Sequence, residues 1–388
     1  MTDNAGTDRQ RKQSALAALQ EVSRKARLFV SMPAVDGVTP RVLMQSPTAE
    51  TVDAGEFVPR RHGMFRLDEI GLSCLDHVGL YGDGVFEGIL IHGGRIFLLK
   101  EHLDRLWRSA SRVALSIPYS PLDLTARLLD TARQVAFAPG DRGYIRLVAT
   151  RGIGDLGINP AKCIGPTVFA LVSTIRLYPR EMYESGIRLG IARYVRQPDE
   201  TIIDPTVKSN NYLKNVLALM EGTQGTNYLE TIILTRDGFV AEATVDNIFL
   251  VRQRPGWETD PAQVLIETPR PEYCLNGITR ALVLRIARDL GYEVNDHADL
   301  LPMNLIGDHR EVFMTGTGAG VMPIVGITNH PVGDGRPGPI TRRLIERVNA
   351  AMESPDYGLP VAASPEQVER YLLSPGLLSM VQPEELPA

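Results

Sequence analysis

The sequence contains little cysteine: Cys74, Cys163 and Cys274 are its three thiols, far apart among 388 residues and without a CxxC pair. No cysteine lies in a cluster with histidine, so we expect neither a disulfide framework nor a bound metal. An odd, sparse count of thiols is typical of a reducing compartment and favours a cytoplasmic location.

Long apolar runs and an excess of basic charge are also missing. The longest hydrophobic stretches have the length of a strand, which predicts no membrane-spanning helix. The first residues, MTDNAGTDRQRKQ, lack the hydrophobic segment of a secretory signal, and acidic residues from Asp3 onward argue against a transit peptide. The formal net charge is -5 with scattered Lys and Arg, so we expect neither nucleic acid nor an anionic membrane as a partner.

Common catalytic signatures are absent as well: there is no Walker sequence, GxSxG elbow, HExxH or Rossmann GxGxxG. Hydrophobic residues make up 44% and charged residues 22%, which is ordinary for a globular enzyme or binding protein. The function therefore has to be read from less conspicuous groups of residues.

Hydrophobic periodicity predicts strands and helices that alternate in two blocks, with hairpin turns at Gly93-Gly94 and Arg236-Asp237-Gly238. This pattern indicates two mixed α/β domains, joined near residues 177–185. The expected strands are residues 85–91, 95–99, 144–150, 166–174, 186–196, 230–235, 239–251 and 311–316, and the expected helices are 14–26, 101–115, 208–222 and 276–291.

Two segments carry specific expectations. Residues 48–61 lack periodicity, which predicts a loop. The helix over 208–222 has an apolar stripe that we expect to be buried, formed by Leu213, Val216, Leu217 and Met220.

Lys208 is the first candidate catalytic residue. It stands in TVKSNNYLKNVLA, where a loop that contains proline meets the helix, with Tyr212 close by. A lysine that forms an imine has to lose its proton near neutral pH, which desolvation or a neighbouring cation makes possible. Taken alone, such a lysine is more often a solvated residue at a helix start.

Glu242 is the second candidate, because it is a carboxylate within the otherwise apolar strand FVAEATVDNIFLV. A carboxylate in such a strand needs a cationic or donor partner, and a protonated pyridine nitrogen would serve. The alternative is a residue that faces solvent from the outer side of the strand.

Three further features suit an anion. The helix opening at Gly277 offers unpaired N–H groups, Ile278 and Thr279 follow, and Thr279 adds a hydroxyl donor. The run Thr315 to Gly318 lets backbone amides converge, and the guanidinium of Arg105 matches a phosphate. Each of these features alone is more often structural.

Taken together, the motifs resemble the fold-type IV, or class IV, pyridoxal-phosphate aminotransferases. The segments that carry the resemblance follow the family's order from about residue 55 to 352: LYGDGVFEGI, EHLDRL, YIRLVATRGIGDLGINP, KSNNYLKNVLA, AEATVDNIF, GITR, MTGTGAGVMPI and GPITRRL. Branched-chain aminotransferases are the most similar subgroup, because YGDGVFEG, YIR and the GIGDLGINP loop fit it.

The resemblance implies pyridoxal 5′-phosphate as cofactor, with Lys208 forming the internal aldimine and moving the substrate proton. Glu242 would pair with the ring nitrogen and Tyr212 with the phenolic oxygen. The resemblance also implies residues that hold the phosphate, namely Arg105, Gly277, Ile278, Thr279 and Thr317.

For substrate binding, the resemblance implies the 152–158 loop together with Tyr81, Phe86, Tyr144, Arg146, Ile158 and Gly318. It also implies a homodimer. The domains it implies are an N-terminal extension (1–54), a small α/β domain (55–178), a large cofactor-binding domain (179–352) and a C-terminal tail (353–388).

The implied reaction is transfer of an amino group from a branched-chain L-amino acid to a 2-oxo acid such as 2-oxoglutarate. The segment KSNNY departs from the KxGGNY of many branched-chain enzymes, and D-amino-acid aminotransferases also use a KS-type segment. Asp246 replaces a frequent glutamate, and Gly320 a frequent acidic residue.

These departures leave alternatives open: a D-amino-acid or amine transaminase, and an elimination like that of aminodeoxychorismate lyase. A rival of another class is a cofactor-binding protein without catalysis.

Overall fold

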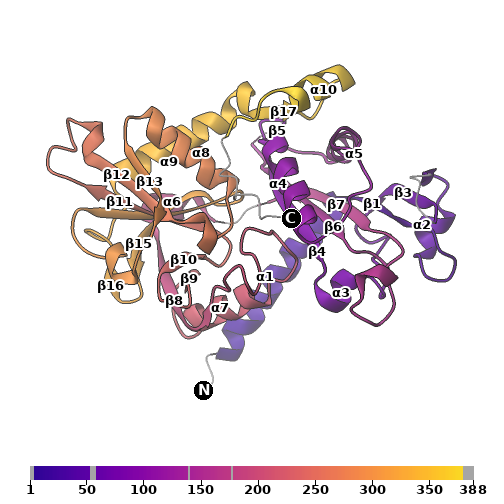
Figure 1. The fold of residues 1–388 in the computed structure, drawn as a ribbon, viewed down its shortest axis with the longest axis horizontal. Helices are drawn as coiled ribbons and strands as arrows, with labels where there is room; N and C mark the ends of the chain where they lie inside the picture. The colour runs from indigo at the N-terminus through magenta and orange to yellow at the C-terminus, as the bar shows by residue number, and fades with distance from the viewer. Residues whose placement is uncertain (1–3, 53–57, 139, 176–177, 379–388) are drawn as a thin grey trace. The chain divides into compact units, whose positions relative to one another are not determined.

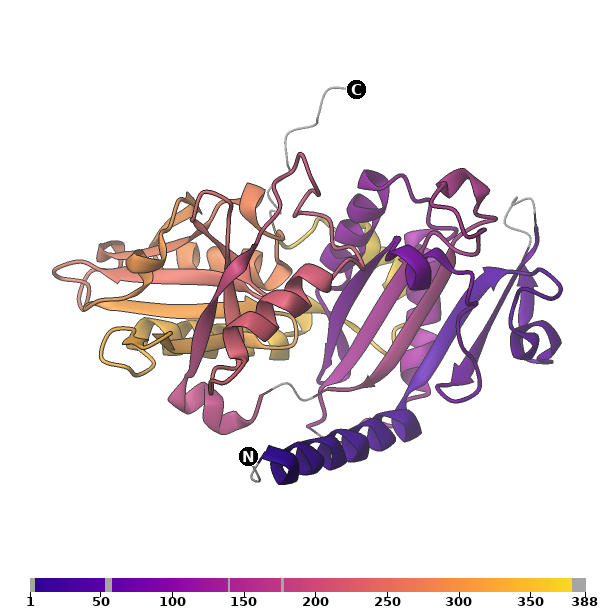
Figure 2. The same ribbon diagram turned by 90° about the horizontal axis from the view of Figure 1, so that it is seen from below.

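The computed structural model describes residues 4–52, 58–138, 140–175 and 178–378, and these residues fall into two compact units (Figures 1 and 2). The first unit comprises Met1–Phe97, Ala110–Ile175 and Leu359–Ser374. The second comprises Leu98–Ser109, Arg176–Gly358 and Pro375–Ala388. The chain therefore passes between the units several times.

The first unit is built on an eight-stranded sheet, in the order β17-β5-β4-β6-β7-β1-β3-β2. Neighbouring strands from β5 to β2 along this order are antiparallel. The strands are β1 (Arg27–Pro33), β2 (Glu50–Val52), β3 (Arg60–Arg66), β4 (Gly84–His92), β5 (Arg95–Phe97), β6 (Gly143–Thr150), β7 (Thr167–Thr174) and β17 (Gly358–Pro360).

The second unit is built on a nine-stranded mixed sheet, in the order β10-β9-β8-β15-β14-β11-β12-β13, with β16 paired to β15. The pairs β8/β9, β8/β15 and β12/β13 are parallel. The strands are β8 (Ile187–Arg196), β9 (Glu230–Leu234), β10 (Val240–Ala243), β11 (Asn247–Gln253), β12 (Val264–Pro269), β13 (Glu293–Ala298), β14 (Arg310–Gly316), β15 (Gly320–Ile327) and β16 (His330–Pro331).

The helices lie around these sheets. In the first unit α5 packs against β1 and β7, and α1 contacts β7, whereas in the second unit α8 and α9 pack against β14 (Figure 1). The α-helices are α1 (Asn4–Lys25), α2 (Arg41–Gln45), α3 (His77–Tyr81), α4 (Leu99–Arg112), α5 (Pro121–Arg133), α6 (Arg180–Ser185), α7 (Leu213–Thr223), α8 (Ile278–Asp289), α9 (Pro339–Glu353) and α10 (Pro365–Leu373). Single 3₁₀ turns are η1 (Pro160–Lys162), η2 (Pro261–Gln263), η3 (Pro271–Tyr273), η4 (Pro302–Leu305) and η5 (Pro355–Tyr357).

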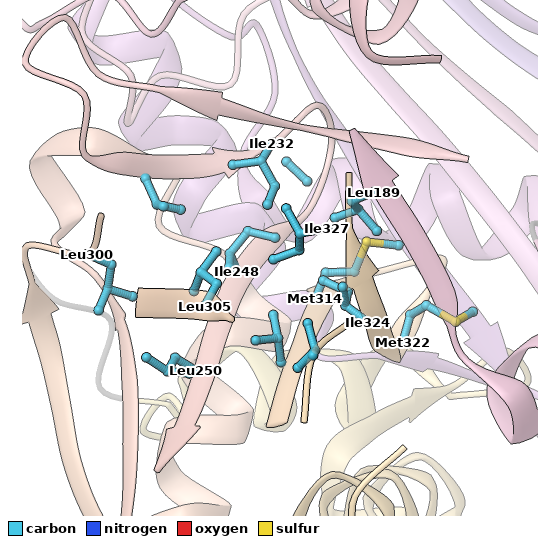
Figure 3. Close-up of a cluster of buried hydrophobic side chains, with 14 of the residues drawn as sticks. Leu189, Ile232, Ile248, Leu250, Leu300, Leu305, Met314, Met322, Ile324 and Ile327 are labelled. Atoms are coloured by element: carbon cyan, nitrogen blue, oxygen red, sulfur yellow. The ribbon is translucent and has the colours of Figure 1, made fainter. Parts of the chain in front are cut away.

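The core of the second unit lies on one side of its sheet, where apolar side chains from β8, β9, β11, β14 and β15 meet (Figure 3). Leu189 and Ile232 come from the neighbouring strands β8 and β9, Ile248 comes from β11, and all three are fully buried. Burial of aliphatic side chains of this size stabilises the fold by about 1.5–3 kcal/mol each. This core fixes the sheet whose edges and loops carry the candidate site.

The mixed α/β class predicted from the sequence is confirmed, as are both hairpins. Gly93 and Gly94 have φ of 55° and 72°, and Gly238 has φ of 89°, conformations that glycine adopts without strain. Helix α8 begins after Gly277 and is followed by Gly291 with φ of 79°, as the sequence predicts.

The predicted orientation of helix α7 is wrong. Leu213, Val216, Leu217 and Met220 are between 45% and 71% exposed, and the helix begins at Leu213 rather than at residue 208. The buried residues are Asn215, Ala218 and Gly222, a stripe of small side chains.

The physical reason is close packing of α7 on β8 and β9. Ala218 packs with Ala192 and Ile233, and a Cβ on Gly222 would lie 2.0 Å from the hydroxyl oxygen of Thr231. No larger residue fits at that contact, so the small stripe faces the sheet and the larger apolar residues face outward.

The prediction of a loop over residues 48–61 is wrong for two parts of it, since β2 begins at Glu50 and β3 begins at Arg60; residues 53–57 lie outside the described residues. β1 lies between β7 and β3 in the first sheet, with nearly all its residues buried. The N-terminal segment thus supplies two strands of the first sheet, the buried β1 and the edge strand β2. Within the described part of the chain, none of the helices combines the length and apolar character needed to span a bilayer.

Candidate active site

Lys208 lies in the loop that joins β8 to α7, and hydrogen bonds within the second unit hold this loop. Asp204 accepts hydrogen bonds from the backbone N–H and the hydroxyl of Thr206, at 2.9 and 2.6 Å. The backbone N–H of Lys208 donates to the Ser109 hydroxyl at 3.2 Å, and its Nζ lies 3.2 Å from the Tyr212 phenolic oxygen. The Lys208 ammonium and the Tyr212 phenol are therefore neighbours.

Glu242 is buried on β10 and accepts two hydrogen bonds. The Gln197 amide donates to Oε1 at 3.1 Å, and the backbone N–H of Leu275 donates to Oε2 at 3.1 Å. Lys214 Nζ donates to the oxygen of the same Gln197 amide. Burial raises the pKa of Glu242, whereas Lys214, the Leu275 N–H, Lys208 and the Gln197 amide counteract this rise.

These side chains line one pocket in the second unit. Its empty volume, which includes space open to solvent, is about 620 Å³. We call five of its polar residues the lysine cluster: Gln197, Lys208, Tyr212, Lys214 and Glu242. The cluster places a primary amine, a phenol and a buried carboxylate around a single cavity.

The residues predicted to bind an anion lie at the start of α8 and on α4. The guanidinium of Arg105, which is 4% exposed, donates to the Asn276 carbonyl at 3.0 Å, directly before the helix start at Gly277. Gly277 provides no side-chain cap, and Ile278 and Thr279 are buried in the first turn of the helix. A helix start without a side-chain cap, next to a buried guanidinium, suits a phosphate.

Asn247 connects this helix start to the turn that contains Thr317 and Gly318. The Asn247 side-chain amide donates to the Leu275 carbonyl at 2.8 Å. In the sheet, Asn247 is paired with Thr315 at the end of β14, just before that turn. A Cβ on Gly277 would lie 2.1 Å from Asn247 Oδ1, so this close approach requires glycine.

A second group of predicted site residues lies in the first unit, on β4 and β6. The Arg146 guanidinium carbon lies 4.4 Å from the centre of the Phe86 ring and 5.6 Å from that of Tyr144. We call Phe86, Tyr144 and Arg146 the arginine cluster. Gly88 pairs with Arg146, and a Cβ on Gly88 would lie 1.9 Å from the Tyr144 hydroxyl, so glycine lets the tyrosine lie across the strand.

Tyr81 and Ile158 also belong to the first unit. The Tyr81 hydroxyl donates to the Leu156 carbonyl and so attaches the end of α3 to the predicted 152–158 loop. Ile158 is 78% exposed on that loop. The structure thus links Tyr81 to the loop and leaves the Ile158 side chain on the surface of the chain.

Two residues of the lysine cluster, Gln197 and Lys214, were not predicted as site residues. Lys214 follows Tyr212 closely, and it is the cationic residue within the first turn of an otherwise largely apolar helix. The position of this cation could have indicated a site residue. From the sequence we instead expected Leu213 and its neighbours to be buried and so assigned the wrong face of α7 to the interior. Gln197 had no signal of its own, because it precedes a proline in an irregular loop.

Asp246, which departs from the family's frequent glutamate, is buried beside this cluster. Burial raises its pKa to about 7, helped by the charges of Glu230 and Glu242 and opposed by that of Lys208. Among the described residues, no group of three or more His, Cys, Asp and Glu side chains is placed to hold a metal ion.

Comparison with known proteins identifies the family of the chain. Residues 84–327 match the family described as "Amino-transferase class IV". The "Putative branched-chain-amino-acid aminotransferase" of Methanocaldococcus jannaschii is 38% identical over 279 residues, which are 71% of this chain and 89% of the relative. The "D-alanine aminotransferase" of Staphylococcus aureus strain MSSA476 is 29% identical, over 74% of this chain and 94% of the relative.

Among solved structures, the T.th. branched-chain amino acid aminotransferase with pyridoxamine 5′-phosphate is similar, with a TM-score of 0.67 and 33% identity. The similarity covers 76% of this chain and 94% of that one. The chain is therefore a class IV aminotransferase with the fold of the fold-type IV enzymes. Within this family it is similar to the branched-chain aminotransferases, and its cofactor is pyridoxal 5′-phosphate.

Proposed function

We propose that the chain transfers the amino group of a branched-chain L-amino acid to a 2-oxo acid such as 2-oxoglutarate, in two half-reactions at one site. The observation that carries the proposal is the lysine cluster, in which Lys208, Tyr212 and Glu242 line a single pocket. The 38% identity to the Methanocaldococcus jannaschii relative, which is named for branched-chain amino acids, supports this donor over D-alanine.

The chemical groups of these three side chains fit pyridoxal phosphate. The amine of Lys208 would hold the aldehyde carbon, the Glu242 carboxylate the ring nitrogen, and the Tyr212 phenol the ring oxygen. The phosphate would lie at the uncapped helix start, held by Arg105, Gly277, Ile278, Thr279 and Thr317.

When bound, the cofactor supplies an electron-withdrawing ring that stabilises negative charge on the substrate carbon next to nitrogen. The protein's own contribution is to move protons. Lys208 has to be a neutral amine to take the proton from that carbon, and its hydrogen bond to the Tyr212 hydroxyl would hold the amine in position.

Substrate binding is assigned to the arginine cluster, Tyr81, Ile158 and Gly318. The faces of Phe86 and Tyr144 hold the Arg146 guanidinium, which would receive the second carboxylate of glutamate or 2-oxoglutarate. Phe86 would contact an aliphatic side chain, and Tyr81 would fix the conformation of the 152–158 loop for substrate binding.

The test is a donor and acceptor panel on the purified protein loaded with cofactor. L-leucine with 2-oxoglutarate should yield glutamate, while D-alanine and primary amines should yield little. Faster transfer from D-alanine would replace the proposal with D-amino-acid transamination. Pyruvate release from aminodeoxychorismate without recovery of an amino group would replace it with elimination.

A homodimer is part of the proposal, and the exposed face of α7 supports it. Leu213, Val216, Leu217 and Met220 form an apolar stripe on the surface, and exposed apolar stripes of this kind mark association surfaces. The low cysteine count supports a cytoplasmic location for the assembly.

Light scattering during gel filtration should give the mass of a dimer for the natural chain and of a monomer for Val216→Glu. The matched control is Leu122→Glu, which adds the same charge at an exposed leucine of α5 and should leave the dimer intact. A monomeric natural chain at micromolar concentration would refute the association.

A further inference from the structure

Lys214 is a second lysine within the cofactor pocket, and the proposed reaction gives it no role. Its ammonium is half-buried on α7 and donates a hydrogen bond to the Gln197 side-chain oxygen. Burial lowers the pKa of Lys214, and the negative charge of Glu242 counteracts this. A buried lysine costs stability unless it has a polar partner, so its placement calls for a reason.

The first consequence is the orientation of the Gln197 amide. An ammonium can only donate hydrogen bonds, so the amide oxygen has to face Lys214 and the amide nitrogen has to face away. That nitrogen donates to Glu242 Oε1 at 3.1 Å. Lys214, Gln197 and Glu242 thus form a chain in which each hydrogen bond fixes the direction of the next.

The second consequence concerns charge. Burial of Glu242 favours its neutral form, and Lys214 is the largest of the influences that oppose this. A neutral Glu242 would carry its own proton and could not accept one from a ring nitrogen. An ionised Glu242 can receive the protonated nitrogen without any change in the number of bound protons.

We infer that Lys214 is a positioning residue that, through the Gln197 amide, keeps Glu242 ionised and aimed at the ring nitrogen before the cofactor enters. The inference deepens the proposed function because it concerns the same site, but it depends on cofactor binding and not on the choice of substrate.

Other titratable groups also face Glu242. Lys208 stabilises its charge. Burial raises the pKa of Asp246 to about 7 and also raises that of the Cys274 thiol, and the charge of Glu242 makes a smaller contribution to each rise. Asp246 is therefore a second carboxyl group beside Glu242 whose protonation bears on this pocket. For this reason the test compares each variant with the natural chain at each pH, so that shared titrations cancel.

The experiment measures the affinity of the cofactor-free protein for pyridoxamine 5′-phosphate by calorimetry from pH 6 to pH 8. This probe carries the ring nitrogen and phosphate but forms no bond with Lys208. In Lys214→Met, Glu242 should hold a proton at low pH and has to release it when the protonated ring binds. The affinity relative to the natural chain should then fall about tenfold per pH unit below the raised pKa of Glu242.

Above the raised pKa of Glu242 the two proteins should bind within about twofold of each other, which also shows that the variant is folded. Lys214→Arg keeps the cation and the donor, so it should restore the natural pH profile. Lys25→Met removes a lysine from α1 and should match the natural chain throughout. In a Glu242→Gln background, which has no carboxyl to titrate, Lys214→Met should cause no pH-dependent loss.

An affinity ratio that is the same at every pH would overturn the inference, as would a loss that persists in the Glu242→Gln background. Either result would leave the transamination proposal intact, because that proposal is judged by glutamate formation. Conversely, a failed substrate panel would not alter these binding profiles.

Discussion

The two groups of candidate site residues hold their cations in different ways. In the lysine cluster, Lys208 and Lys214 make hydrogen bonds to Tyr212 and Gln197 inside a pocket that also contains a buried carboxylate. In the arginine cluster, Arg146 lies over the Phe86 ring and is half-buried. Polar partners fix an amine at one position, which proton transfer requires.

A ring face, in contrast, supports the flat side of a guanidinium and leaves the N–H groups in its plane directed sideways, where a carboxylate can meet them. From this difference we predict that the lysine cluster carries the chemistry and the arginine cluster recognises the substrate. Substitutions in the lysine cluster should therefore affect every substrate alike, and those in the arginine cluster should affect only some.

The largest effect is expected for Lys208→Ala. Without the amine, turnover with all donors should fall by at least about 10³-fold, because both the covalent attachment and the proton carrier are lost. The visible absorbance of the bound cofactor should change with it, while circular dichroism stays that of the natural chain. A variant that transaminates at nearly the natural rate would remove Lys208 from the mechanism.

A smaller but equally general effect is expected for Glu242→Ala. Cofactor should still bind through its phosphate, but the first half-reaction should slow by about 10²–10³-fold, as is typical when a preorganised charge is removed from an active site. Rapid mixing with L-leucine and with L-glutamate should show the same slowing for both. Unchanged single-turnover rates would contradict the role of this carboxylate.

The smallest effect is expected for Arg146→Leu, and it should be selective. A hydrogen bond to a charged group contributes about 1.5–3 kcal/mol, so kcat/KM for 2-oxoglutarate should fall about 10- to 150-fold. For 4-methyl-2-oxopentanoate, which lacks a second carboxylate, the change should stay within about threefold. Equal losses for both acceptors would show that the arginine cluster does not distinguish them.

The sequence predicted the fold class and the membership of much of the candidate site. Lys208, Tyr212 and Glu242 line one pocket as a group, and Arg105 lies against the residue before Gly277. Such residues can be found because imine, carboxylate and phosphate chemistry each require particular side chains at particular kinds of chain position. Their individual roles remain predictions.

The orientation of α7 could not be predicted from periodicity. Its sequence carries both an apolar stripe and a stripe of small residues, and a hydrophobic pattern by itself favours burying the first. What decides the matter is the close approach of Gly222 to Gly190 and Thr231, a contact between segments distant in the sequence. The same error hid Lys214 and, with it, the partner of Gln197.

Helix α7 has one more consequence. It starts soon after Lys208, contributes Lys214 to the pocket and presents its apolar stripe to the outside. If a second chain covers that stripe and association stabilises the position of α7, subunit association strengthens cofactor retention, and thermodynamic reciprocity requires the cofactor to strengthen association by the same factor. Dilution of the enzyme would then release cofactor, and a shortage of cofactor would favour dissociation of the dimer.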